Sequence, residues 1–464
     1  MPAAPVPATS SAHELAAALR LRHIGAEELL RCCLDRIERL DGPVNSVVTL
    51  DADRALADAR RADAETARGQ SRGPLHGLPI TVKDAIETAG IRSTGGAAEF
   101  ADHVPARDAT AVARLRAAGA IVFGKTNLPA WSGDMQTYND LFGTTNNPWA
   151  PQLSPGGSSG GAAAAVACGL TAFELGTDIG GSIRIPSHLC GTFGLRPSTG
   201  LVPQDGYLAG PRASRAGLDI NTFGPIARSA EDLGLLLGVL SGPAEADAAA
   251  WSLRLPPGPG PLRDFRVGLW LDDPFCPVDA EYRSLLTALA DRLADAGAQV
   301  RDSHPEVPFA EAFEIYWTLL SAANGLNEAD ADPPCPAPSH RRWLACDEER
   351  RRQRAVWRDW FTGFDVLLCP VLAVTGYPHD QTGTFATRSV AVNGRPRTHV
   401  DIARWTGLVG ALGLPVAVAP VGATAAGRPV GVQIVADRWR DLTATRFAAL
   451  AAGFTGGYRV PPGF

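Results

Sequence analysis

The amino-acid sequence predicts an α/β fold with a largely buried β-sheet, and two observations lead to this prediction. Helical and strand-like patterns alternate along the chain, as they do in α/β proteins. The 464 residues are 45% apolar and 20% charged, a composition typical of a globular chain with a sizeable core. A chain of this length forms either two to three ordinary domains or one large α/β unit.

The first half of the chain begins with a helical region and continues with short strands that lead into turns. Apolar residues recur at three- and four-residue steps after a Ser-Ser pair, which is typical of a capped amphipathic helix. Short apolar runs bounded by glycine and proline indicate strands. The expected elements are a helical region at 11–67, a strand at 78–82 that ends on Lys83, a helix at 110–118, a strand at 119–123, a loop at 143–161, a helix at 162–168 and a strand at 173–175.

The second half of the chain opens with a Pro/Gly-rich break at 255–262, which we interpret as a linker or an exposed loop. A strand at 265–271 and a long helix at 279–296 are expected to follow it. Two further stretches, 328–340 and 372–400, have no helical or strand period. Because loops often carry binding residues, both are expected to form walls of a pocket.

Composition excludes several classes of function. The net charge of -6 argues against a nucleic-acid binder, and no apolar run reaches the roughly 20 residues of a membrane-spanning helix. The first ten residues lack the pattern of a secretory signal. The eight cysteines contain no CxxC pair and the nine histidines no HExxH motif. We therefore expect a cytoplasmic protein without a metal or a cofactor, which binds neither nucleic acid nor membrane.

Lysine is almost absent from this chain. Of 43 basic residues only two, Lys83 and Lys125, are lysines, and all others are arginines. Arginine stays protonated at any working pH, whereas a buried lysine can lose its proton and act as a base. Lys83, at the end of a predicted strand, is therefore our candidate for a general base.

Two glycine-rich loops each contain a candidate serine. One is GGSSGG at 156–161, and the other is GTDIGGS at 176–182. Glycines allow consecutive backbone N–H groups to point at one spot, so those from Ile179 to Ser182 would form an oxyanion hole beside a serine hydroxyl. A serine nucleophile needs a base, and only His76 and His188 lie near these motifs in sequence. A neutral lysine would supply that base.

These motifs resemble those of the amidase signature family. The resemblance rests on GLPITVKD, GKTN, NNPW, SPGGSSGG, GTDIGGSIRIP, CGTFGLRPS and GPIARS between 73 and 228, and on GLPVAVAP and GRPVGVQIV between 413 and 435. It implies one amidase domain over 1–464, with a mixed, twisted sheet that carries helices on both faces. Its parts would be an N-terminal helical region at 11–70, a core at 73–228, and a C-terminal part at 263–464 that completes the sheet and the pocket.

The resemblance also implies a Ser-Ser-Lys triad and an acyl-enzyme mechanism. Ser182 would be the nucleophile, Ser158 the bridging serine after a cis peptide bond, and Lys83 the base. The product would be a carboxylic acid and an amine from a small-molecule amide, and many members of the family form dimers. The oxyanion hole would consist of the N–H groups of Ile179, Gly180, Gly181 and Ser182. Structural support would come from Ser159, Thr177, Asp178 and Arg184.

Three alternatives compete with this interpretation. The family also contains the amidase subunit of tRNA-dependent amidotransferases, which needs partner proteins and takes ammonia from glutamine. A catalytically inactive scaffold is a second alternative, although all three triad positions are present. The third is an esterase with Ser158 in a GxSxG elbow, but an elbow follows a buried strand, and the segment before Ser158 is rich in proline.

The segment Gly119 to Thr126 also matches the phosphate-binding pattern GxxxxGK[ST]. In that motif the residues between the glycines form a flexible loop whose N–H groups bind phosphate. Here the four central residues are themselves a predicted strand, whose N–H groups pair within a sheet. We therefore expect no nucleotide, and expect Lys125 to be structural or to line the site.

The sequence departs from the common family pattern just after GKTN. Many members continue with Met-Pro-Glu-Phe, whereas this chain has Leu-Pro-Ala-Trp and so exchanges a carboxylate for an indole. Aromatic residues are also dense between 311 and 362. We expect a small apolar or aryl amide as the substrate, with aryl esters and carbamates as side substrates. The residues expected to bind it are Trp131, Asp134, Met135 and Gln136, although Trp131 fits a buried structural role equally well.

Overall fold

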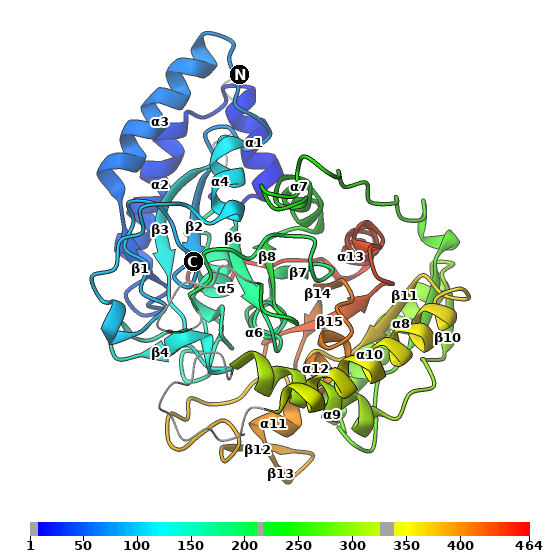
Figure 1. Cartoon of the computed structure of the whole chain (residues 1–464). Helices are drawn as coiled ribbons and strands as arrows, with labels where there is room; N and C mark the ends of the chain where they lie inside the picture. The colour runs from blue at the N-terminus through cyan, green and yellow to red at the C-terminus, as the bar shows by residue number, and fades with distance from the viewer. Residues whose placement is uncertain (1–7, 209, 211–216, 325–337) are drawn as a thin grey trace.

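The computed structural model describes residues 8–208, 210, 217–324 and 338–464 (Figure 1). Most of the first ten residues, in which we expected no secretory signal, and most of the irregular stretch at 328–340 lie outside these residues. The α/β class predicted from the sequence is confirmed. Helices and strands alternate along the chain, and the strands assemble into one large central sheet.

The main sheet contains 11 strands within the described residues, in the order β1-β3-β2-β6-β8-β7-β14-β15-β11-β9-β10. The sheet is mixed, because β3-β2-β6 and β11-β9-β10 pair in parallel and the other neighbours pair in antiparallel. Its strands are β1 Val47–Leu50, β2 Pro79–Lys83, β3 Ile121–Thr126, β6 Glu174–Asp178, β7 Phe193–Arg196, β8 Thr222–Ala227, β9 Arg266–Leu269, β10 Gln299–Asp302, β11 Val366–Cys369, β14 Val416–Ala423 and β15 Pro429–Val435.

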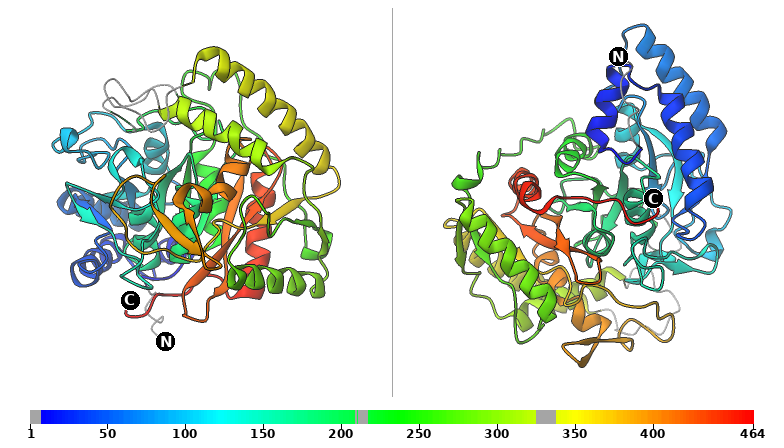
Figure 2. Two further views of the ribbon diagram at one scale, coloured as in Figure 1. Left: turned by 90° about the horizontal axis from the view of Figure 1, so that it is seen from below. Right: turned by 180° about the vertical axis from the view of Figure 1, so that it is seen from behind.

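Helices cover the sheet on both faces, and two small hairpins lie outside it (Figures 1 and 2). The N-terminal helices α1–α3 lie at one end of the molecule, and α8 and α10 lie at the other. The helices are α1 Ala12–Arg20, α2 Ala26–Leu40, α3 Ala52–Ala67, α4 Thr110–Ala117, α5 Gly160–Ala167, α6 Arg184–Cys190, α7 Ala230–Leu240, α8 Ala280–Asp295, α9 Phe309–Asn324, α10 His340–Trp360, α11 His399–Ile402, α12 Arg404–Gly410 and α13 Asp441–Thr455. The hairpins pair β4 Tyr138–Asn139 with β5 Gly143–Thr144, and β12 Ser389–Val392 with β13 Arg395–Thr398.

Local sequence explains where the predicted helices begin. The Ser11 side chain accepts a hydrogen bond from the N–H of Glu14, and the Glu14 side chain accepts one from the Ser11 N–H, so the pair forms a capping box. Asp279 caps α8 by accepting from the N–H groups of Glu281 and Tyr282. The predicted helix at 279–296 therefore matches α8 to within a residue at either end.

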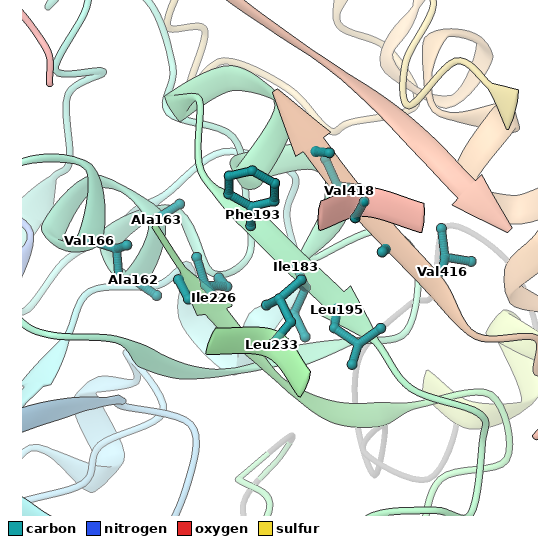
Figure 3. Packing of buried hydrophobic residues seen from close by; sticks show 14 of the residues in the cluster. Ala162, Ala163, Val166, Ile183, Phe193, Leu195, Ile226, Leu233, Val416 and Val418 are labelled. Carbon is teal, nitrogen blue, oxygen red and sulfur yellow. The ribbon is translucent and has the colours of Figure 1, made fainter. Parts of the chain in front are cut away.

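The core is continuous beneath the predicted serine loops. Helix α5 consists of small residues, all of them buried, and packs closely on β2, β6 and β8. Figure 3 shows Ala162 and Val166 of α5 on the same core as Ile226 of β8 and Val418 of β14. Ile183, the residue after Ser182, is fully buried in this cluster. The second serine loop is thus anchored directly in the core.

The structure corrects the sequence prediction in four places. The helical region at 11–67 contains a strand, β1, which pairs with β3. Strand β3 extends past the predicted 119–123 to include Lys125, and α5 begins at Gly160, inside the predicted loop. The irregular stretch 372–400 contains the β12–β13 hairpin.

In the described part of the chain, no helix has the combination of length and apolarity that crossing a bilayer requires.

Candidate active site

Parallel pairing of β2 with β6 brings Lys83 to the glycine-rich loop at 156–161, which carries Ser158. Thr81 is opposite Glu174 and Val82 is opposite Leu175, so both strands end at the same edge of the sheet. There the Lys83 Nζ donates hydrogen bonds to the Ser158 Oγ at 2.6 Å and to the Thr177 Oγ1 at 2.7 Å. These two contacts join the end of β2 to the Ser158 loop and to β6, which leads into the Ser182 loop.

The environment of Lys83 favours a neutral amine. Its side chain is completely buried, and burial lowers the pKa of Lys83 to about 7, although the carboxylates of Asp178 and Glu174 act in the opposite direction. Both of its hydrogen-bond partners are hydroxyl groups, which can accept from an ammonium or donate to an amine. Lys83 can therefore hold or release a proton near neutral pH.

The segment after Trp131 packs against the loop that carries Ser158 and holds it in place. The peptide bond between Gly157 and Ser158 is cis, as the family resemblance implied. A Cβ on Gly157 would lie only 2.7 Å from the backbone carbon of Met135, so only glycine fits there. The Thr137 hydroxyl donates to the Gly156 carbonyl at 2.8 Å and accepts from the Gly160 N–H at 3.1 Å. These contacts leave the loop little freedom.

The loop that carries Ser182 is joined to the Ser158 loop through the backbone. The N–H of Ser159 donates to the carbonyl of Ser182 at 3.1 Å, and the Ser159 hydroxyl is bonded to the backbone of Thr177. Ser158 is completely buried, whereas Ser182 is 8% exposed. Ser182 is thus the more accessible of the two serines that we predicted to act together.

Asp178 braces the Ser182 loop from within the core. Its carboxylate accepts from the N–H groups of Gly181 and Ile183, and Arg184 binds it through Nε and Nη2 at 3.0 and 2.8 Å. The Nε of Arg196 lies 3.6 Å from it. Burial raises the pKa of Asp178, but the two guanidinium groups and the N–H donors outweigh burial and hold the pKa below its usual range.

The backbone of the Ser182 loop offers N–H donors, but they are not equivalent. Among the described residues, the N–H groups of Ile179, Gly180 and Ser182 have no protein acceptor. The N–H of Gly181, which we also predicted as a donor, is already bonded to Asp178 at 2.9 Å. On the opposite side of that peptide unit, the Thr406 hydroxyl donates to the Gly180 carbonyl at 2.8 Å and fixes its orientation.

The predicted substrate-binding residues 134–136 are held by the stretch 377–388. Asp134 forms an ion pair with Arg388 at 2.5 Å. The side-chain amide of Gln136 donates to the carbonyl of Asp380 and accepts from its N–H. Met135 is buried, and its carbonyl accepts from the Tyr377 hydroxyl. The polar groups of this segment are therefore bonded within the protein, which leaves the wall without an unpaired charge.

Trp131 adopts an unusual backbone conformation beside the same segment. Its φ is 53°, and its N–H donates to the carbonyl of Gly95 at 2.8 Å. The indole packs edge-on against Phe100 at 5.3 Å between ring centroids and covers Gly95. Trp131 is only partly buried, so the ring forms a surface at the margin of this region.

Two residues from distant elements contact the Ser182 loop; sequence reasoning did not identify Thr406, and it named Tyr316 only as one of the aromatic residues of 311–362. One is Thr406 of α12, described above. The other is Tyr316 of α9, whose hydroxyl lies 2.5 Å from where a Cβ on Gly180 would be. Tyr316 shares an apolar cluster with Ile179 and Phe313, and neighbouring Trp317 lies 5.9 Å from Phe385. Only the aromatic density of 311–362 indicated this wall in the sequence.

The two motif matches that we rejected have structural explanations. Ile121–Thr126 is a strand paired with both β1 and β2, so its N–H groups are unavailable to a phosphate. Lys125 is buried and donates to the carbonyl of Ile86 and to the hydroxyls of Thr88 and Ser93. Residues 154–158 are not a strand, so Ser158 does not follow the strand that a nucleophile elbow requires.

Known proteins resemble this chain in sequence. The family described as Amidase matches residues 28–336 and 335–444. The chain is 36% identical over 327 residues to a glutamyl-tRNA(Gln) amidotransferase subunit of Moorella thermoacetica, a match that covers 69% of this chain and 66% of that protein. The chain thus spans just under two thirds of that relative's length.

Two further likenesses extend over nearly the whole chain. An acylamidase of Rhodococcus erythropolis is 32% identical over 460 residues, which cover 95% of this chain and 94% of that protein. The crystal structure of a bacterial aryl acylamidase from the amidase signature enzymes superposes with a TM-score of 0.80 at 26% identity, covering 96% of each chain. Together with the family match, these likenesses establish that the chain belongs to the amidase signature family.

Proposed function

We propose that this protein is a serine amidohydrolase that cleaves a carboxylic amide to an acid and an amine through an acyl-enzyme on Ser182. One observation carries the proposal. A completely buried lysine, Lys83, contacts Ser158 at 2.6 Å, and the loop of Ser158 is hydrogen-bonded to the loop of Ser182. A buried amine beside a serine hydroxyl can act as a general base without histidine.

In the first half of the reaction, neutral Lys83 accepts the proton of Ser158, and Ser158 accepts the proton of Ser182. The Oγ of Ser182 then forms a bond to the carbonyl carbon of the amide. The N–H groups of Ile179, Gly180 and Ser182 stabilise the negative charge on the oxygen. Because the N–H of Gly181 is bonded to Asp178, we assign Gly181 to bracing the loop rather than to the oxyanion hole.

In the second half, the tetrahedral intermediate collapses and the C–N bond breaks. The proton taken from Ser182 passes through Ser158 to the departing amine. Water then attacks the ester on Ser182, with Lys83 and Ser158 again accepting and returning a proton, and the acid is released. The net reaction consumes one amide and one water and yields one acid and one amine.

The proposed substrate is a small apolar or aryl amide, and aryl esters and carbamates are proposed side substrates. The aromatic wall of α9, with Phe313, Tyr316 and Trp317, stands beside the Ser182 loop. On the other side, Asp134 is neutralised by Arg388 and so leaves no free charge to bind an ionic substrate. An apolar pocket selects ligands mainly by the apolar area that they bury.

A second candidate function is the amidase subunit of a tRNA-dependent amidotransferase. The likeness to the Moorella thermoacetica protein supports it. The acylamidase likeness covers 95% of this chain at 32% identity, and two other amidotransferase subunits cover 93% and 92% of it at the same identity, so coverage does not separate the two functions. The two functions differ in whether the isolated chain forms an acyl-enzyme with a simple amide.

The test is to treat the purified chain with a small fluorophosphonate, measure the intact mass, and map the adduct. One adduct on Ser182, absent from Lys83→Ala, is the expected result. An adduct on Ser158 would contradict the proposed roles of the two serines. A chain that neither reacts nor hydrolyses an anilide would favour the partner-dependent enzyme or an inactive scaffold.

A further inference from the structure

Glu174, the first residue of β6, is a buried carboxyl group that the proposed mechanism does not use. It is completely buried, and no charged side chain of the described residues bonds to its carboxylate. No arginine, lysine or histidine of the described chain lies within 4.0 Å of it. Leaving such a group unpaired in the core is costly, so its presence needs an explanation.

Strand register places Glu174 on the same face of the sheet as Lys83. Glu174 is opposite Thr81 on β2, and Lys83 lies two residues further along that strand. Thr126 of β3 is opposite Lys83. The hydroxyls of Thr81 and Thr126 are also buried, close enough to the Glu174 carboxylate to lower its pKa. Four polar groups therefore gather on this face, and Lys83 is the only cation among them.

Helix α5 covers this face and supplies no charge. A Cβ on Gly176, two residues after Glu174, would point at the Ser159 hydroxyl at the start of α5. The body of α5 contains only glycine, alanine and valine, all buried. The covering helix is thus apolar and offers no charge to an ammonium on this face.

The other charged groups nearby are already matched. Asp178 is bound by Arg184 and approached by Arg196. Lys125 lies on β3, one residue before the position that pairs with Lys83, and it donates to three oxygens at or near Ile86. Asp84, the residue after Lys83, accepts from the N–H and the hydroxyl of Thr94. Glu174 therefore remains the buried carboxylate on this face that no other group neutralises.

The titration behaviour of the pair agrees with this geometry. Burial raises the pKa of Glu174 to about 7, although the hydroxyls of Thr81 and Thr126 act in the opposite direction. The charge of Lys125 also lowers the pKa of Glu174, by a smaller amount. Burial lowers the pKa of Lys83 to about 7, so the two groups change charge over the same pH range. When Lys83 gains a proton, an ionised Glu174 balances the new charge.

We propose that Glu174 is a positioning residue for the base. Its carboxylate, buried beneath α5 on the same face as Lys83, adds to Asp178 a second negative charge against which Lys83 becomes protonated in each turnover, and so raises its basicity. This assignment rests on the proposed role of Lys83 as the base. Glu174 touches neither serine, so its effect must pass through Lys83.

The test compares wild type with Glu174→Gln, which keeps the shape and removes the charge, by measuring fluorophosphonate inactivation rates across pH. Without the carboxylate, protonated Lys83 is less stable, so the acid limb should move down by about 0.5–1 pH unit. The plateau rate should also fall, because a weaker base accepts a proton less readily. Asp232→Asn is the matched control, because Asp232 is another buried carboxylate but accepts hydrogen bonds from α1. The acid limb of its pH profile should not move.

Three results would overturn the assignment. A lower plateau with an unmoved acid limb would make Glu174 merely structural, and an upward shift would reverse the sign. If Glu174→Met, an apolar replacement, and Glu174→Gln both failed to fold while Glu174→Asp folded, the carboxylate would be a requirement of the fold instead. If wild type itself gave no adduct on Ser182, the proposed function would fail first, which distinguishes the two failures.

Discussion

At the scale of single residues, the two lysines of this chain differ in the kind of partner that they bind. Lys125 donates to a backbone carbonyl and two hydroxyls, whereas the acceptors of Lys83 among the described residues are the hydroxyls of Ser158 and Thr177. A carbonyl can only accept, so this contact needs an N–H of Lys125, whose pKa burial lowers to about 8. The hydroxyls around Lys83 serve either protonation state. The same residue type is therefore structural on β3 and suited to proton transfer on β2.

The first prediction concerns the pH dependence of the base. Burial lowers the pKa of Lys83 to about 7, and only the neutral amine can accept the proton of Ser158. As pH falls through about 7, Lys83 becomes protonated and kcat/KM should fall about tenfold per unit, whereas above that value it should reach a plateau. Initial rates with an anilide between pH 5 and 9 would measure this. A profile that stays flat to about pH 5, where carboxylates begin to titrate, would contradict it.

The second prediction separates the two lysines by substitution. Lys83→Met should reduce the labelling rate at least about 1000-fold while the protein stays folded, because the base is lost. Lys125→Met should lower the free energy of unfolding by about 2–3 kcal/mol, because three buried acceptors lose their donor. The folded fraction of Lys125→Met should still be labelled on Ser182. Urea unfolding and adduct mass measure the two effects, and loss of labelling in folded Lys125→Met would contradict the structural role.

At the scale of elements, the sequence predicted those whose signals are local. The cap at Ser11, the helix at 279–296 and the strand that ends on Lys83 could be found from neighbouring residues. Strand β1 could not be predicted, because four residues within a helical pattern are too few to show the alternation of a strand. The contacts of Thr406 and Tyr316 with the Ser182 loop also escaped prediction. They join segments far apart in the chain, and no local pattern encodes such a meeting.

The third prediction tests the fit between α9 and the Ser182 loop. Gly180→Ala would place a Cβ 2.5 Å from the Tyr316 hydroxyl, so the loop or the helix must move. The φ of Gly180 is not positive, so alanine fits its backbone and stability should change little. We expect the labelling rate to fall between about 10- and 1000-fold as oxyanion donors are displaced. The double variant Gly180→Ala/Tyr316→Phe removes the clashing oxygen and should recover part of the rate; no recovery would show that the contact does not matter.

The fourth prediction concerns the ion pair that joins residues 134–138 to 377–388. Arg388 and Asp134 are almost fully buried, and Arg388 also donates to the Tyr138 hydroxyl. Arg388→Ala would leave the Asp134 carboxylate buried without its partner, at a cost of about 3–5 kcal/mol. Because this segment backs onto Gly157, labelling of Ser182 should also slow. Arg395→Ala, at an exposed arginine of the nearby hairpin, is the control and should change stability by less than about 0.5 kcal/mol.

At the scale of the whole molecule, strand order matters more than strand content. Strands β7 and β8 from the middle of the chain stand between β6 and the C-terminal pair β14–β15. The C-terminal part of the chain therefore completes the sheet directly beside the site. The sequence predicted the class of fold and the motifs at the site. It could not predict this order, because strand neighbours are chosen by packing across the whole sheet, and the family resemblance indicated only that the C-terminal part completes the sheet.

The last prediction tests how the site is fastened to that C-terminal part. Arg184 binds Asp178 and also donates to the Thr406 carbonyl and the Gln433 side chain, so one buried guanidinium joins β6, α12 and β15. Arg184→Met should lower the free energy of unfolding by about 3–5 kcal/mol, because it leaves a buried carboxylate without its partner. Asp178→Asn/Arg184→Met should cost less than the sum of its single variants, because the stranded charge is gone. The exposed pair Arg283–Asp272 is the control, with a coupling below about 1 kcal/mol. If urea unfolding showed that the losses in free energy of unfolding at 178 and 184 simply add, the two residues would stabilise the site independently of one another.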